Sequence, residues 1–299
     1  MSAPALPGRV ERPEPGLRRV LAPNPSPLTG AGTNSYILGH GRVAVIDPGP
    51  DDPGHLAALM AALEPGERVG WIVLTHSHRD HAGLARALSG ATGAPVVGFG
   101  PAESGRSPVM AALAGAGLRG GEGVVAGFAP DARLADGDRI DGDGWALVAL
   151  HTPGHMANHL CLRWGEAVFS GDHVMGWAST LVSPPDGDMG QYMASLDALQ
   201  AVGPARLYPG HGAPVPDPAA RIDELRAHRR MRETQILSAL RDGPADSATL
   251  AARLYTETPP ALLGAAARNV LAHLIDLHAR DRVTTDGTPG PDSAFAYRA

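Results

Sequence analysis

The feature that most constrains this chain is a dense group of metal-binding side chains directly after an apolar run. Residues 71–74 are continuously apolar and predict a buried β-strand. The next seven residues contain His76, His78, Asp80 and His81. Crowded polar side chains at the end of a strand need solvent, hydrogen-bond partners or a ligand. We therefore expect a fold in which a strand presents this cluster in a loop.

Three more polar residues lie in glycine-flanked loops, each of which follows a predicted strand. They are His155 in Thr152-Pro153-Gly154-His155, Asp172 in Ser170-Gly171-Asp172 and His211 in Pro209-Gly210-His211-Gly212. Loops held by a rigid scaffold often carry functional residues. We expect these three loops and the cluster to converge on one pocket.

Metal chemistry explains why these residue types belong together. Zinc readily takes imidazole nitrogen and carboxylate oxygen, and its catalytic sites keep a position open for water. His76 and His78 can reach one ion from a turn, while Asp80 and His81 project toward a second. The cluster predicts two divalent ions, with Zn2+ expected first and iron or manganese as alternatives.

The loop residues supply the remaining ligands in this interpretation. His155 could complete three nitrogens on the first ion, and His211 could join Asp80 and His81 on the second. Asp172 could bridge both ions. At roughly 3.5–4 Å apart, two ions can share and deprotonate one water, so we expect a metal-bridging hydroxide as nucleophile. Asp80 would orient it.

The alternative is a set of unrelated histidines, since the chain contains 13 of them. A single histidine is most often a surface or structural group. Three histidines and an aspartate between positions 76 and 81 would be an unusual loop without a ligand. We therefore favour the metal interpretation for the cluster.

Several neighbours of the cluster have predicted supporting roles. His173 is a tentative general acid, while His159 and Asp47 are expected to orient ligands. Asn34 and Trp177 are candidate substrate contacts because they flank the metal motifs. Three further residues could line the pocket, with simple packing favoured for the last two: Tyr36, Met175 and Tyr192.

The His-x-His-x-Asp-His pattern at residues 76–81 resembles the hallmark of the metallo-β-lactamase fold superfamily. The later motifs at His155, Asp172 and His211 match in order, and the resemblance extends over about residues 17–216. It implies an α/β protein, an αβ/βα sandwich with two mixed β-sheets inside, helices outside and metals at one edge. An aspartate bridge is similar to glyoxalase II and the ribonuclease Z type rather than to the zinc β-lactamases.

Three segments give a narrower resemblance, to the β-lactamase-like protein 2 family. They are Gly32-Thr33-Asn34-Ser35-Tyr36, residues 170–177 and residues 184–189. The animal member is a mitochondrial endoribonuclease acting on single-stranded RNA, and fungal relatives include thioesterases that release polyketides. The resemblance therefore implies two different chemistries.

The chain divides into three predicted parts. Residues 1–16 form a proline-rich segment, residues 17–217 the catalytic domain, and residues 218–299 a small C-terminal winged-helix-like domain. Helical periodicity over 218–240, helices over 247–254 and 260–279, and a hairpin pairing 282–285 with 295–298 support the last part. The resemblance implies the same domain.

The substrate remains open between two hydrolase chemistries. Cleavage of single-stranded RNA phosphodiesters would require a basic groove that leads to the metals. Its candidate contributors, with Arg229 and Arg230 foremost, are Arg79, Arg226, Arg229, Arg230 and Arg232. A small-molecule ester or thioester, cleaved by a glyoxalase II-like or acyl-thioesterase reaction, is the alternative. A third and weaker interpretation is a non-catalytic nucleic-acid or partner-binding protein with structural metals, although such sites are usually closed and rich in cysteine.

Composition limits the remaining partners and the compartment. A formal net charge of −6 gives no global attraction to polyanions. The single cysteine, Cys161, excludes an intrachain disulfide and fits a reducing compartment. We see no apolar signal core and no membrane-spanning run, so the expected location is cytoplasmic, without a membrane partner. A homodimer is left open.

Overall fold

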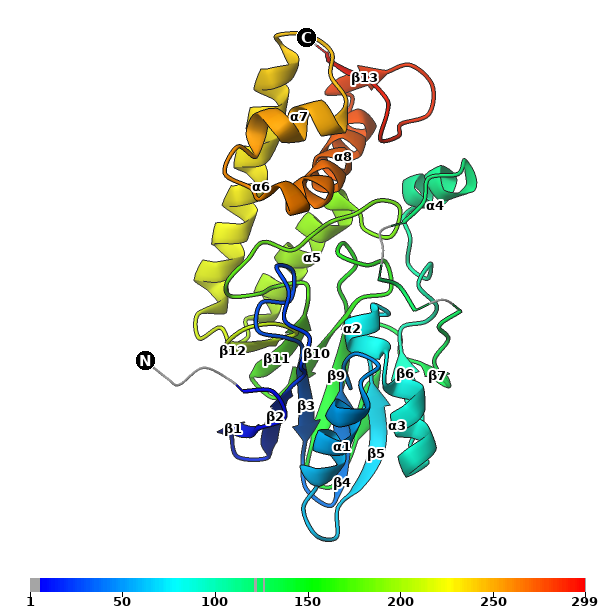
Figure 1. Cartoon of the computed structure of the whole chain (residues 1–299), viewed down its shortest axis with the longest axis vertical. Helices are drawn as coiled ribbons and strands as arrows, with labels where there is room; N and C mark the ends of the chain where they lie inside the picture. Colours follow the sequence, from blue (N-terminus) through cyan, green and yellow to red (C-terminus); the bar gives the residue numbers. More distant parts are fainter. Residues whose placement is uncertain (1–5, 121–122, 126, 299) are drawn as a thin grey trace.

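The first of two packed sheets lies in the lower part of the molecule (Figure 1). The computed structural model describes residues 6–120, 123–125 and 127–298. In spatial order the strands are β1 (Val10–Glu14), β2 (Leu17–Leu21), β3 (Asn34–Leu38), β4 (Arg42–Ile46), β5 (Arg68–Val73), β6 (Val96–Gly98) and β7 (Ala132–Arg133). Neighbours from β1 to β4 are antiparallel, and those from β4 to β7 are parallel.

The second sheet is also mixed. In spatial order it contains β12 (Arg206–Pro209), β11 (Ala167–Gly171), β10 (Leu160–Trp164), β9 (Ala146–His151) and β8 (Arg139–Asp141). Strands β8 to β11 pair antiparallel, while β11 and β12 are parallel. The prediction of two mixed sheets is confirmed.

Apolar side chains fill the space between the sheets and the space beneath the outer helices. Tyr36, Phe169 and Tyr208 pack between the sheets, with ring centroids 5.1 to 5.8 Å apart. The short helix of the polar cluster is α2 (Arg79–Ala82), and it joins α1 (Pro53–Ala61) and α3 (Ala85–Thr92) over the first sheet. The second sheet is covered by α5 (Met189–Val202) and the start of α6 (Pro218–Leu240). This helix, sheet, sheet, helix order is the predicted αβ/βα sandwich.

The C-terminal helices form a separate core beyond the sandwich, at the top of Figure 1. After α6 come α7 (Ser247–Leu254), the short 3-10 helix η1 (Pro260–Leu262), α8 (Leu263–Ala279), and the hairpin of β13 (Val283–Thr285) with β14 (Phe295–Tyr297). The Asp246 carboxylate caps α7 by accepting from the Thr249 amide at 2.7 Å. Helix, helix and hairpin match the predicted winged helix.

Two segments differ from the sequence-based expectation. The sequence predicts that the proline-rich segment 1–16 lies outside the catalytic domain. In the structure this segment contains β1, which pairs with β2 and so belongs to the first sheet. Contacts far along the chain hold β1, since the Tyr208 hydroxyl donates to Glu14 at 2.5 Å. The stretch 110–130 had no predicted structure, yet it begins within α4 (Pro108–Gly115), whose Met110 packs on the C-terminal core.

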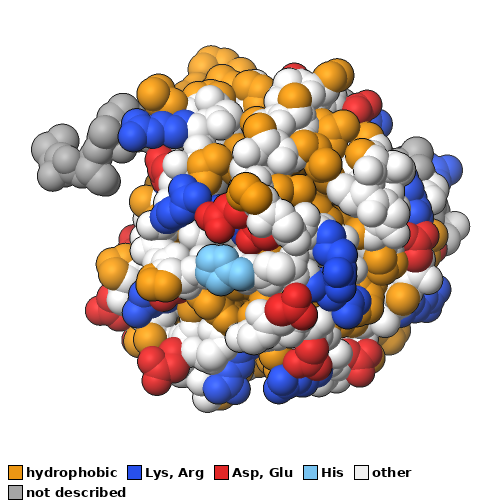
Figure 2. All heavy atoms as spheres, turned by 90° about the horizontal axis from the view of Figure 1, so that it is seen from below, with side chains coloured by type: hydrophobic (Ala, Val, Ile, Leu, Met, Phe, Trp, Pro, Cys, Tyr) orange, Lys and Arg blue, Asp and Glu red, His pale blue; other side chains and the backbone are white. Residues whose placement is uncertain are grey.

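Charge is mixed on the face seen from below in Figure 2, where acidic and basic side chains alternate among apolar ones. Among the described residues, no helix combines the length and apolar character needed to cross a membrane.

Candidate metal centre

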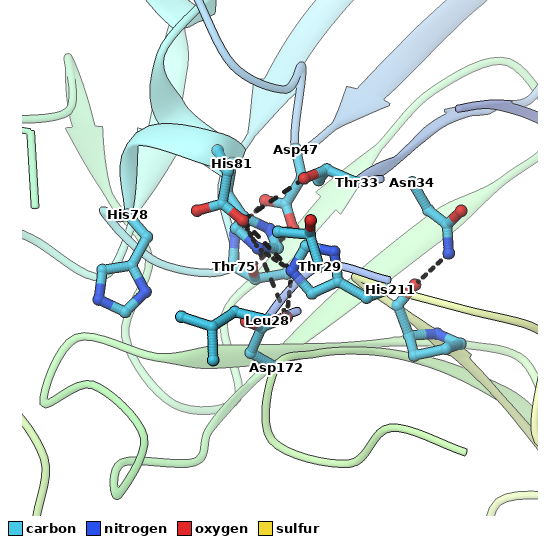
Figure 3. Close-up of polar contacts among 12 residues, drawn as sticks. Leu28, Thr29, Thr33, Asn34, Asp47, Thr75, His78, His81, Asp172 and His211 are labelled. Atoms are coloured by element: carbon cyan, nitrogen blue, oxygen red, sulfur yellow. Dashed lines mark hydrogen bonds and ion pairs between the residues drawn. The ribbon is translucent and has the colours of Figure 1, made fainter. Parts of the chain in front are cut away.

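All seven predicted ligands converge at one edge of the sandwich, at the ends of β5, β9, β11 and β12. Figure 3 labels His78, His81, Asp172 and His211 among them. They form two groups, each offering ligand atoms within 4.8 Å of one another. The first group is His76, His78, His155 and Asp172, and the second is Asp80, His81 and His211. The tertiary fold therefore places residues from four separate loops in the grouping that the sequence suggested.

In the first group, three histidine ring nitrogens face one another, and there are too few N–H hydrogens to form hydrogen bonds between them. His78 Nδ1 lies 3.0 Å from His76 Nε2 and 3.1 Å from His155 Nε2. The outer nitrogen of His155 donates to the Leu181 carbonyl at 2.7 Å, which leaves its Nε2 with a lone pair. Thr75 Oγ1 donates to the Asp47 carboxylate, so it accepts from His76 Nδ1, and His76 Nε2 carries a lone pair too.

At most one hydrogen, on His78, can therefore serve three converging nitrogens. Facing lone pairs at about 3 Å repel unless a cation lies between them. The donor set of nitrogen and carboxylate oxygen suits zinc, and it also suits iron. The residues present thus fit a metal ion.

Asp172 faces both groups. Its Oδ1 lies 3.4 Å from His81 Nε2 and 3.4 Å from His211 Nε2, while its Oδ2 lies 3.7 Å from His155 Nε2. Oδ1 is buried and has no hydrogen-bond partner among the described residues. A carboxylate with one oxygen toward each group has the geometry of a bridge between two ions.

The electrostatics of the two groups differ. Burial lowers the pKa of His76 well below its usual value and that of His78 to about 3, so both rings are neutral and offer lone pairs. Burial also lowers the pKa of His211, but the Asp172 and Asp80 carboxylates outweigh it and raise that pKa to about 9. His81 is raised well above its usual pKa in the same way. The second group therefore attracts positive charge, which a bound cation would supply.

Asp47 holds the cluster from behind. It follows β4 with a φ of 48°, a conformation that costs a non-glycine residue free energy. Its carboxylate accepts from the Thr75 amide at 2.8 Å, from Thr75 Oγ1 at 2.7 Å and from His81 Nδ1 at 2.9 Å. This arrangement agrees with the predicted supporting role.

Asp47→Asn should weaken metal binding about 10–100-fold, the usual cost of losing a hydrogen-bonded partner behind a ligand. Thr75 Oγ1 and His81 Nδ1 share one carboxylate oxygen, while the Thr75 main-chain amide donates to the other. An asparagine has only one oxygen, so its NH2 group must face one of these donors. Competition with a chelator measures the affinity, and Asp51→Asn on the exposed neighbouring turn is the matched control. Wild-type affinity in Asp47→Asn would contradict the supporting role.

Two other histidines near the cluster differ in their surroundings. His159 Nε2 accepts from the Asp172 amide at 3.2 Å, as expected of a group that orients a ligand. His173 is buried against the Tyr192 ring, with centroids 5.1 Å apart and no hydrogen-bond partner for either ring nitrogen among the described residues. Burial lowers its pKa to about 3, so it is neutral. Its position does not support the tentative role as general acid.

Asn34 supports the loop that carries His211. Its side-chain amide donates to the Pro209 carbonyl at 3.0 Å and the Gly212 carbonyl at 2.9 Å. The side chain is buried and makes both bonds within the fold, so the structure gives it a positioning role and does not support the predicted substrate contact.

The arginines of α6 do not form the predicted basic groove. Arg229 is 1% exposed, so its position does not support the predicted contact with substrate. Arg226 is paired with Asp197 and Asp223 at 2.7 and 2.6 Å, and Arg232 lies over the Tyr255 ring. Arg230 and Arg79 are exposed. Burial, ion pairing and packing on an aromatic ring therefore engage three of the five proposed contributors.

The predicted pocket residues divide by exposure. Trp177 is 45% exposed and packs against the backbone at Gly30 and at Gly212, the residue after His211. It is therefore beside the second group of ligands and open to solvent. Three others are buried and serve packing: Tyr36, Met175 and Tyr192.

Some partners of the ligands were not predicted. Thr33 Oγ1 lies 3.4 Å from Asp80 Oδ2, and the carbonyls of Gly32 and Leu181 accept from His211 and His155. Backbone carbonyls have no side-chain signature, so sequence reasoning had no signal for them. Thr33 lay within a recognised motif but carried no distinguishing chemistry of its own.

A two-sheet αβ/βα sandwich with this ligand cluster at its edge defines a protein of the metallo-β-lactamase class. Residues 28–211 match the family model described as "Metallo-beta-lactamase superfamily", and residues 247–291 match "Beta-lactamase associated winged helix domain". The chain belongs to the metallo-beta-lactamase superfamily, with the associated winged helix as a second domain.

Similar proteins span nearly the whole chain. A Beta-lactamase-like protein 2 homolog of Drosophila melanogaster is 32% identical over 287 residues, covering 91% of each chain. An atrochrysone carboxyl ACP thioesterase of Aspergillus chevalieri is 34% identical over 245 residues, covering 80% of this chain and 70% of its own. The solved structure of a metallo-beta-lactamase family protein from Thermus thermophilus aligns with a TM-score of 0.75 at 26% identity, covering 95% of this chain and 99% of its own. These relatives indicate a hydrolase of the superfamily.

Proposed function

We propose that this chain is a binuclear metal-dependent hydrolase, with zinc the expected metal, and that its substrates are acyl thioesters. The observation that carries the metal centre is the convergence of His76, His78 and His155, whose ring nitrogens face one another with too few hydrogens. When bound, two such ions would polarise the substrate carbonyl and lower the pKa of a water so that it can attack.

The chain's own residues position the attack. Asp80 Oδ2 lies 3.2 Å from His211 Nε2, and the Asp80 side chain is 28% exposed, so it can also accept a hydrogen bond from an attacking water. Asp172 Oδ1 lies 3.4 Å from His81 Nε2 and its Oδ2 lies 3.7 Å from His155 Nε2, so the two carboxylate oxygens face different groups. The cluster thus supplies orientation as well as ligands.

The leaving group favours a thioester over an RNA phosphodiester. His173, the predicted general acid, is buried and neutral. A thiolate leaves without being protonated because the pKa of a thiol is only about 8.5, whereas a sugar alkoxide needs a proton donor. The buried and ion-paired arginines of α6 remove further support for a polyanionic substrate.

Exposed apolar side chains beside the cluster fit an acyl substrate. Trp177 is 45% exposed and Leu28 is 53% exposed. Leu28 lies in the loop between β2 and β3, which reaches the cluster through Thr33, and Figure 3 draws it in one close-up with Asp172 and His211. Apolar walls with a few polar groups are typical of small-molecule sites. A relative named as an ACP thioesterase is consistent with this substrate class.

The testing experiment measures metal content and then hydrolysis of an acyl thioester and a labelled single-stranded RNA side by side. We expect two metal ions per chain and thioester hydrolysis that a chelator abolishes. Metal-dependent RNA cleavage without thioester hydrolysis would replace the proposed substrate. Two bound ions with neither activity would favour a binding protein with structural metals.

Trp177→Ala should raise KM for a long-chain acyl thioester about tenfold and leave kcat within about twofold. The tenfold change corresponds to about 1.4 kcal/mol, the scale of partly burying one large apolar side chain. Steady-state kinetics against acyl chain length measure it, with Met231→Ala, an equally exposed apolar residue on α6, as control. A fall in kcat at unchanged KM would contradict a substrate-binding role.

A further inference from the structure

Arg229 is a fully buried cation whose hydrogen bonds and ring contact within the described part of the chain are all with neutral groups. It is 1% exposed, and among the described residues no carboxylate lies within ion-pair distance. Its guanidinium donates to the Thr180 carbonyl and to Asn269 Oδ1, and it lies 5.0 Å from the Tyr192 ring centroid. Burying a charge is costly unless polar groups compensate, so the side chain must be held by these contacts.

The contacts of Arg229 belong to a wider set of bonds between the C-terminal helices and one segment, residues 180–184, between β11 and α5. Asn269 on α8 accepts from the Val182 amide at 3.2 Å. Arg268, also on α8, donates to Ser183 Oγ at 3.1 Å and to the Pro184 carbonyl at 3.2 Å. Helices α6 and α8 therefore fix this segment at several consecutive positions.

The same segment contacts two residues of the first ligand group from its other side. The Leu181 carbonyl accepts from His155 Nδ1 at 2.7 Å. Thr180 Oγ1 donates to the Asp172 carbonyl at 2.6 Å. A displacement at Leu181 would therefore change the orientation of the His155 ring, whereas the bond from Thr180 holds the main chain of Asp172 and not its carboxylate.

We propose that Arg229 is a positioning residue for the metal centre, acting through residues 180–181 on His155, so that the C-terminal domain helps to build the first metal site. The outer hydrogen bond of a ligating histidine sets its tautomer and the direction of its lone pair. This inference rests on the two-metal centre of the proposed function. It adds that one of the two sites depends on the C-terminal helices.

The test is a titration of the full-length metal-free protein with cobalt(II) chloride, followed by visible absorption and chelator competition. In Arg229→Met, one of two cobalt equivalents should bind about 10–100-fold more weakly, with an altered visible spectrum. The affinity for the other cobalt equivalent should stay within about twofold of the wild-type value. Arg229→Lys, which keeps the charge but has a single donor nitrogen, should restore part of the affinity. Arg230→Met, one residue along the same helix and exposed, is the matched control.

The outcomes separate this inference from the proposed function. Wild-type protein that binds no cobalt would overturn the metal centre itself. Normal binding of both equivalents by Arg229→Met, or equal weakening of both, would overturn only the positioning role, since a merely structural residue affects both sites alike. If Arg229→Met does not fold, the same comparison with Arg229→Lys decides between these outcomes.

Discussion

His76→Ala should reduce turnover on the order of 10³-fold or more, because metal polarisation of the substrate is worth several kcal/mol and each 1.36 kcal/mol is tenfold in rate. His76 is 1% exposed, and its Nε2 lies 3.0 Å from His78 Nδ1 in the first ligand group. Removing the ring removes one of three converging nitrogens. Metal content and thioester turnover, measured on the same preparation, check the result.

His40→Ala is the control for this variant. His40 lies 3.8 Å from Glu67 and 3.9 Å from Glu64 and so belongs to a third group of potential ligands, but its side chain is 67% exposed. Both acids are already paired with arginines, at 2.6 Å for Glu67 and 3.0 Å for Glu64. We expect His40→Ala to keep its metal and its activity. Full activity of His76→Ala at unchanged metal content would remove His76 from the site.

Asp172→Asn should weaken the binding of both metal ions. It should also reduce turnover about as much as His76→Ala does, on the order of 10³-fold. Each carboxylate oxygen faces a different ligand group, and an amide can present only one oxygen and carries no charge. In a metal titration of this variant, neither of the two equivalents should bind with the wild-type affinity.

His211→Ala is the informative comparison for Asp172→Asn. His211 belongs to the second group alone. Its loss should therefore lower the affinity for one metal equivalent and leave the affinity for the other within about tenfold of wild type. If the two variants lost the same single equivalent, Asp172 would be a ligand of one ion and not a bridge.

The proposed role of Arg229 changes how the C-terminal domain is understood. The structure shows two of its helices bonded to the segment behind His155. Removing residues 218–299 should therefore disturb the metal centre as well as the C-terminal core. This dependence gives a reason, independent of nucleic acid, for the second domain to accompany the first.

Most of the fold was predictable because its elements carry local signals. The apolar runs at residues 43–46 and 71–74 coincide with β4 and with the end of β5, and the periodicity of 218–240 matches α6. Elements without such signals were missed. β7 is two residues long, and α4 packs on a core more than 100 residues away in sequence. Local propensity is silent where long-range contacts provide the stabilisation.

The sequence by itself determined the types of side chain available to the site, since the spacing within residues 76–81 and the glycine-flanked loops are local properties. The convergence of His155, Asp172 and His211 on that cluster came from the tertiary fold. Only the tertiary structure decided whether the arginines of α6 and His173 are buried or exposed to solvent. Arg229 reads as a surface charge in an amphipathic helix, yet two helices and a loop enclose it. Burial depends on which elements meet, and a side chain's charge, accessibility and proton affinity follow from those neighbours and not from its own position in the chain.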